Sequence, residues 1–107
     1  MKRYCLTLNL KDDSQLIREY EEHHKTIWPE ISKSIKDAGV IDMQIYRFGI
    51  RLFMIMDAVD DFSFKRKAEM DAANPKVQEW ENLMLTYQQP FKNSGQKWVL
   101  MDKIFQL

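Results

Sequence analysis

The sequence has little of what several classes of protein require. It contains one cysteine, Cys5, so no disulfide can form within the chain, and an apolar neighbourhood makes a buried thiol the simplest interpretation. Sixteen basic residues balance sixteen acidic residues, which leaves no charge footprint for nucleic acid or an anionic membrane surface. No segment approaches the roughly 20 apolar residues that cross a bilayer, and no signal peptide is recognisable. These features predict a cytoplasmic protein that binds neither nucleic acid nor membrane.

Glycine and proline are scarce, with three of each, so long loops and linkers are not expected. The length suffices for one hydrophobic core, and we expect a single domain over residues 1–107. The sequence contains no Gly-rich phosphate loop, paired-cysteine motif or nucleophile elbow. Adjacent residues of a helix point about 100° apart, which makes His23 and His24 a poor pair of ligands for one metal ion. We therefore predict neither a metal nor a cofactor.

Apolar residues repeat at every second position in some segments and at every third or fourth position in others, which distinguishes strands from helices. Asp12, Asp13 and Ser14 are favourable N-caps, while Pro29 suits the first turn of a helix and Gly39 its end. The predicted strands are residues 3–10, 41–48, 51–57 and 97–105, and the predicted helices are about 14–27, 29–38, 60–70 and 75–87. The order β-αα-ββ-αα-β is typical of α+β ferredoxin-like folds of the dimeric α/β-barrel type, in which helices cover one face of an antiparallel sheet.

Two of the predicted strands are apolar on both faces. They are residues 51–57 and residues 97–105. A single layer of helices covers only one face of a sheet, and a large apolar patch rarely faces water. The sequence therefore predicts a homodimer that packs sheet against sheet.

The predicted first helix places a tyrosine and a histidine on one face. Tyr20 and His24 are four residues apart, which brings their side chains within reach of each other, and Ile17 lies on the same face. Histidine is the side chain whose ordinary pKa lets it both accept and donate a proton near neutral pH. A histidine in an apolar stripe can also be a structural group that hydrogen bonds satisfy. The spacing by itself does not decide whether His24 has a catalytic or a structural role.

Aromatic residues are numerous for a chain of this size. Tryptophan and tyrosine combine a flat apolar ring with a polar tip, which suits stacking on the C–H face of a sugar while bonding its hydroxyl groups. Most of these rings are expected to belong to the hydrophobic core, and spacing alone does not gather them into one pocket. The rings concerned are Trp28, Trp80, Trp98, Tyr20, Tyr46 and Tyr87.

The segment Tyr20-x-x-x-His24-x-x-Ile27-Trp28-Pro29-Glu30 resembles the L-rhamnose mutarotase family. The resemblance extends over nearly the whole chain, through a short first strand, the strand that contains Ile45-Tyr46, the apolar strand Leu52–Met56, Trp80 and a short last strand. The resemblance implies a dimeric ferredoxin-like fold. It also implies an isomerase that interconverts the α and β anomers of a 6-deoxy-hexose, by acid–base catalysis and without a cofactor.

The same resemblance assigns residues to the site. His24 matches the family's proton donor, and Tyr20 and Trp80 match residues that contact the sugar. Tyr46 is a further candidate for contact with the substrate. The partner that the resemblance implies is a small-molecule sugar.

Two positions depart from the family's best-known form. Met43 stands where that form has a tyrosine, and Glu81 stands where it has a second tryptophan. The implied substrate is L-rhamnose, and L-fucose or another 6-deoxy-hexose is the alternative. The second proton-transfer group stays open among Tyr20, Glu30, Asp57 and water.

Two other classes of protein use small dimeric ferredoxin-like domains. One comprises monooxygenases that degrade haem or oxidise quinols, in which a histidine near the pocket serves the haem or the substrate. The other holds a small metabolite without catalysis. A haem absorbance band would indicate the first class, and sugar binding without faster anomer exchange would indicate the second.

Overall fold

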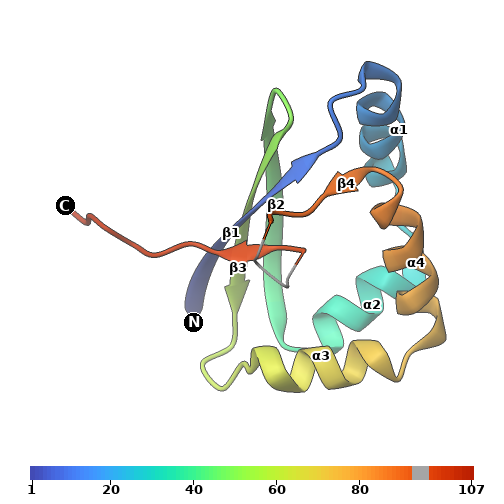
Figure 1. The fold of residues 1–107 in the computed structure, drawn as a ribbon. Coiled ribbons are helices and arrows are strands. Elements are labelled where there is room, and N and C mark those ends of the chain that lie inside the picture. The colour runs from blue at the N-terminus through green and yellow to red at the C-terminus, as the bar shows by residue number, and fades with distance from the viewer. Residues whose placement is uncertain (93–96) are drawn as a thin grey trace.

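The computed structural model describes residues 1–92 and 97–107. These residues contain a five-stranded sheet, four helices and the segments that connect them (Figure 1). The strands are β1 (Lys2–Leu10), β2 (Val40–Phe48), β3 (Arg51–Ala58), β4 (Gln88–Gln89) and β5 (Val99–Leu100), and the helices are α1 (Ser14–Lys25), α2 (Pro29–Asp37), α3 (Phe64–Ala72) and α4 (Pro75–Leu85). The strand order is β2-β3-β1-β4, all neighbours are antiparallel, and β5 also pairs with β1. Helices α1 to α4 lie on one side of the sheet (Figure 1). The predicted α+β ferredoxin-like fold is confirmed, and none of the described helices is long and apolar enough to cross a membrane.

The helices begin and end at the residues that favour their termini. The Asp13 side chain accepts two backbone N–H groups of the first turn of α1, and Asn74 does the same for α4. Pro29 occupies the first turn of α2, and Gly39 follows the helix with a positive φ of 99°. Helix α3 begins a few residues later than predicted, because Ser63 caps it through its side-chain oxygen. These local signals fix where each helix sits over the sheet.

Alternate residues of the central strands form the core beneath the helices. Leu6, Leu8 and Leu10 of β1 are all buried. In the antiparallel register, Leu6 lies opposite Met54 and Leu8 opposite Leu52, so both strands turn apolar side chains toward the same face. Burying a side chain of this size stabilises a fold by about 1.5–3 kcal/mol. The pairing thus anchors the sheet against the helical layer.

The chain beyond residue 100 differs from the prediction. The predicted strand over residues 97–105 is wrong except for β5, and after Met101 donates its N–H to the Cys5 carbonyl, the chain leaves the sheet (Figure 1). Ile104 is 94% exposed and Phe105 is 76% exposed. A strand that is apolar on both faces needs an apolar surface on each side. No other described part of the chain covers either side of residues 101–107. We call residues 101–107 the C-terminal segment.

Candidate functional site

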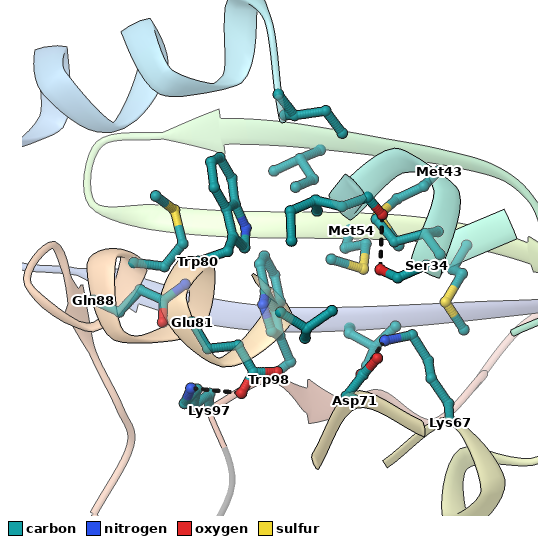
Figure 2. Close-up of a pocket in the computed structure, with 18 of the residues that line it drawn as sticks. Ser34, Met43, Met54, Lys67, Asp71, Trp80, Glu81, Gln88, Lys97 and Trp98 are labelled. Atoms are coloured by element: carbon teal, nitrogen blue, oxygen red, sulfur yellow. Dashed lines mark hydrogen bonds and ion pairs between the residues drawn. The ribbon is translucent and has the colours of Figure 1, made fainter. Parts of the chain in front are cut away.

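A cavity of about 560 Å³ lies between the sheet and the helices, which is within the usual size range of small-molecule sites. Met43 and Met54 lie on its sheet side (Figure 2), and Ile45 of β2 also lines it. Tyr20 and His24 enter from α1, and further lining residues come from the other three helices and from the chain next to β4 and β5. The cavity is therefore mainly apolar, with a limited set of polar groups that can orient a ligand.

Tyr20 and His24 form the closest aromatic pair in the cavity wall. Their ring centroids are 4.3 Å apart, with the ring planes inclined by 34°. His24 Nδ1 lies 2.8 Å from the backbone oxygen of Tyr20. A carbonyl oxygen only accepts hydrogen bonds, so Nδ1 must carry a hydrogen and donate it. In the neutral ring, Nε2 then holds a lone pair that can accept a proton.

Burial sets the protonation of both groups. It lowers the pKa of His24 below the ordinary value of 6.5, while the bond to the Tyr20 carbonyl acts in the opposite sense. Burial also raises the pKa of Tyr20 to about 12, opposed by a contact with the Gln88 side chain. At neutral pH the pair is thus a neutral imidazole beside a protonated phenol. The first can accept a proton and the second can donate one.

Trp80 supplies a flat apolar surface next to this pair. It lies on α4, lines the cavity and is only 9% exposed. Its ring is 5.6 Å from His24 at an interplanar angle of 64°, and the Trp28 ring packs edge-on against it from outside the cavity lining at 5.1 Å. The structure therefore brings together three of the predicted site residues, His24, Tyr20 and Trp80.

The fourth predicted site residue, Tyr46, does not line this cavity. It follows Ile45 on β2, and successive strand residues point to opposite sides. Tyr46 is 57% exposed, and its hydroxyl donates to the Gln44 side chain at 3.1 Å. It borders a second, shallower hollow that also touches Tyr20 and His24.

His23 has a different environment from His24. Its Nε2 lies 3.1 Å from the hydroxyl of Tyr87, and the two rings are 5.6 Å apart. His23 is half-buried in this contact and does not line the cavity. The sequence pattern is ambiguous here, because adjacent helix positions differ by only about 100° in direction.

Two ion pairs border the cavity at separate places (Figure 2). Lys97 Nζ is 3.6 Å from Glu81 Oε2, and Lys67 Nζ is 2.6 Å from Asp71 Oδ2. Lys67, Asp71 and Lys97 were not predicted as site residues from the sequence. The i, i+4 spacing of the α3 pair was a usable signal, whereas the approach of Lys97 to Glu81 depends on tertiary structure.

Trp98 and Gln88 are two more lining residues that sequence analysis did not assign to the site. Trp98 was recognised only as one of several aromatic residues. Gln88 carries no sequence signal, because an isolated glutamine resembles a surface residue. Its position becomes apparent only from the short strand β4, which was not predicted and which pairs with the end of β1.

The fold and the cavity define a ferredoxin-like protein with a mainly apolar cavity, in whose wall Tyr20 and His24 pack together. The sequence model of the L-rhamnose mutarotase family matches residues 3–107. The chain belongs to this family.

Individual relatives agree with this assignment. The chain is 40% identical over 111 residues to an L-fucose mutarotase of Xanthomonas campestris pv. campestris, covering 100% of this chain and 89% of the relative. It is 34% identical over 84 residues to an L-rhamnose mutarotase of Phocaeicola vulgatus, covering 78% and 77% of the two chains. The relatives are thus named for two different sugars.

Solved structures support the fold. The L-rhamnose mutarotase of Formosa agariphila superposes with a TM-score of 0.75 at 21% identity, covering 100% of this chain and 99% of that one. Tetracenomycin F2 cyclase from Streptomyces glaucescens, a polyketide cyclase, superposes with a TM-score of 0.64 at 17% identity, covering 100% and 97%. At these identities the likeness concerns the fold alone.

Proposed function

We propose that this protein is a mutarotase, an isomerase that interconverts the α and β anomers of a 6-deoxy-hexose. The observation that carries the proposal is the Tyr20–His24 pair in a mainly apolar cavity of a chain that belongs to this family. Sugar anomers already interconvert in water, so an enzyme needs only positioned acid–base catalysis, which is worth about 10²–10⁴-fold. The site supplies that chemistry from its own side chains.

The proposed reaction begins at the anomeric hydroxyl. Nε2 of neutral His24 accepts its proton, the oxygen's electron pair forms the aldehyde, and the bond from the anomeric carbon to the ring oxygen breaks. The ring oxygen takes a proton, for which Tyr20 is the candidate donor because burial keeps its hydroxyl protonated. The aldehyde rotates about the adjacent carbon–carbon bond, and the same transfers in reverse, with protonated His24 now the proton donor, close the ring as the other anomer. No atom or electron is gained or lost.

L-Rhamnose is the first candidate substrate, because the family model carries that description. L-Fucose is the second, and the fucose-named relative at 40% identity favours it. Glu81 brings a carboxylate paired with Lys97 to the cavity wall, at the position where the family's best-known form has a second tryptophan. A carboxylate accepts hydrogen bonds from hydroxyl groups, so it senses their positions on the ring in a way that a second tryptophan cannot.

Saturation-transfer NMR tests the proposal directly. Anomer exchange is measured with the native protein on L-rhamnose, on L-fucose and on D-glucose, which retains the 6-hydroxyl. We expect faster exchange for at least one of the 6-deoxy sugars, and the ratio of kcat/KM values identifies the preferred one. Sugar binding without faster exchange would instead identify a non-catalytic binding protein.

The pH dependence follows from the lowered pKa of His24. A protonated imidazole cannot accept the anomeric proton, so we expect kcat/KM to hold through neutral pH and to fall only as the pH drops well below 6.5. Stability changes in the same direction: the unfolded chain binds this proton at the ordinary pKa, so the folded state loses stability from pH 6.5 down through the lower folded pKa. Exchange rates and melting temperatures measured across pH, with His24→Ala for comparison, check both. Exchange that quickens below pH 6.5 would contradict a base role.

We also propose that the active form is a homodimer, packed sheet against sheet. The face of the sheet opposite the helices carries Phe53 and Ile55, both half-buried, and the C-terminal segment projects away from the sheet on the side opposite the helices (Figure 1). A second copy of the chain packed here would bury both the outer face of the sheet and the C-terminal segment. Cys5 lies on the same face, opposite Ile55, with a free thiol. Such a thiol stays reduced in the cytoplasm, which is the location we propose.

Two aspartates in the C-terminal segment are expected to abolish the dimer. Ile104→Asp with Phe105→Asp places two charges where the proposal requires apolar contact, and desolvating unpaired charges is prohibitive. The neighbouring Lys103→Glu, which changes an exposed charge, is the matched control and should stay dimeric. Light scattering at micromolar concentration distinguishes the forms. A native protein that is monomeric there would overturn the dimer.

A further inference from the structure

The side chain of Gln88 has an unused hydrogen-bonding atom at the cavity. Gln88 is 5% exposed and lines the cavity together with Tyr20 and His24. Its backbone is fixed by the pairing of β4 with Leu10 of β1. The side-chain oxygen Oε1 is buried and has no hydrogen-bond partner among residues 1–92 and 97–107. Buried polar atoms are normally bonded, so this one requires a reason.

The other end of the same amide is used. The contact between Gln88 and Tyr20 opposes the effect of burial on the pKa of the phenol, as expected when an amide N–H donates to the phenol oxygen. With that oxygen accepting from Gln88, the hydroxyl hydrogen of Tyr20 is free to point elsewhere. Rotating the amide by half a turn exchanges its oxygen and nitrogen, but one of these two atoms still has no hydrogen-bond partner among the described residues. The side chain thus interacts with Tyr20, while its Oε1 has no partner among the described residues.

We propose that Gln88 binds a hydroxyl group of the sugar and, through its second atom, holds the Tyr20 hydroxyl in place for proton transfer. This inference rests on the proposed mutarotase activity. Figure 2 shows Gln88 on the same side of the cavity as Trp80 and Glu81. A sugar that stacks on Trp80 therefore lies next to the Gln88 side chain. A buried group built to bond a hydroxyl discriminates strongly against a ligand that lacks it.

Gln88→Met tests the assignment, because methionine has a similar length but cannot hydrogen-bond strongly. We expect kcat/KM for anomer exchange to fall roughly tenfold, the effect of losing one hydrogen bond. We also expect the sugar-free variant to melt near the native temperature, since removing the unsatisfied buried oxygen stabilises the fold while losing the interaction with the Tyr20 phenol destabilises it. Gln89→Met, on the exposed neighbouring position of β4, is the matched control and should change neither value.

Monodeoxy analogues identify the hydroxyl group. If Gln88 binds a particular hydroxyl, removing that hydroxyl should slow the native protein and leave Gln88→Met no slower than it already is. Unchanged kcat/KM in Gln88→Met, or a lowered melting temperature with additive losses for every analogue, would overturn the inference. A native protein without any exchange activity would instead overturn the proposed function itself.

Discussion

The variant His24→Ala is expected to exchange sugar anomers about 10²–10⁴-fold more slowly than the native protein, which is the usual contribution of one acid–base group. The side chain is half-buried, its Nδ1 is occupied by the Tyr20 carbonyl, and only Nε2 is free to move a proton. Alanine removes this nitrogen and leaves space in the cavity. Saturation-transfer NMR on L-rhamnose and L-fucose measures the loss.

His23→Ala is the control for this prediction. It removes the adjacent imidazole and its contact with the Tyr87 hydroxyl, but His23 does not line the cavity. We expect a small loss of stability and a nearly native exchange rate. Free imidazole should also partly restore exchange in His24→Ala, because it can occupy the vacated space. A folded His24→Ala variant with native exchange would remove His24 from the mechanism.

Replacing Trp80 is expected to produce the largest loss of stability. Trp80 packs against Trp28 and His24 and is 9% exposed, so Trp80→Ala removes a core ring as well as a cavity wall. Truncations of this kind cost about 3–5 kcal/mol. In a domain of this size such a loss lowers the melting temperature by roughly 15–30 °C. Thermal unfolding followed by circular dichroism measures it.

Two further variants separate packing from sugar contact. Trp80→Phe keeps a flat ring, so we expect a folded protein whose KM rises roughly 2- to 10-fold while kcat changes little. Trp28→Ala removes the neighbouring ring, which contacts Trp80 but does not line the cavity. It should lower stability and leave KM near the native value. A native KM in Trp80→Phe, with a raised KM in Trp28→Ala, would contradict the assigned sugar contact.

The sequence predicted the features that depend on local patterns. Alternation along residues 3–10 indicated β1 and its buried face, and Asp13, Pro29 and Gly39 marked helix termini that the structure places at those residues. The spacing of Tyr20 and His24 indicated a shared helix face, and their rings do pack together. These relations need only the geometry of one helix or one strand, which is why they could be predicted.

Features that depend on distant segments were harder to predict. The predicted last strand stops at Leu100. Its apolar pattern continues to Phe105, but pairing also requires a partner strand, which the pattern of residues 97–105 does not reveal. Gln88 enters the cavity wall only because β4 pairs with the end of β1, 78 positions earlier in the case of Leu10. The Glu81–Lys97 pair likewise joins segments that no local period connects. A single sequence contains no local signal for these contacts between distant segments.

The division of the site between elements has an evolutionary consequence. Tyr20 and His24 lie one helical turn apart on α1, and a backbone bond within that turn orients the imidazole. Other residues of the cavity wall, such as Met43 and Glu81, belong to β2 and α4. Mutation can therefore remodel the pocket wall and shift the preferred sugar while the proton-transfer unit stays intact. The Tyr20–His24 contact therefore depends on one helix, whereas the shape of the cavity depends on all four helices and on the sheet.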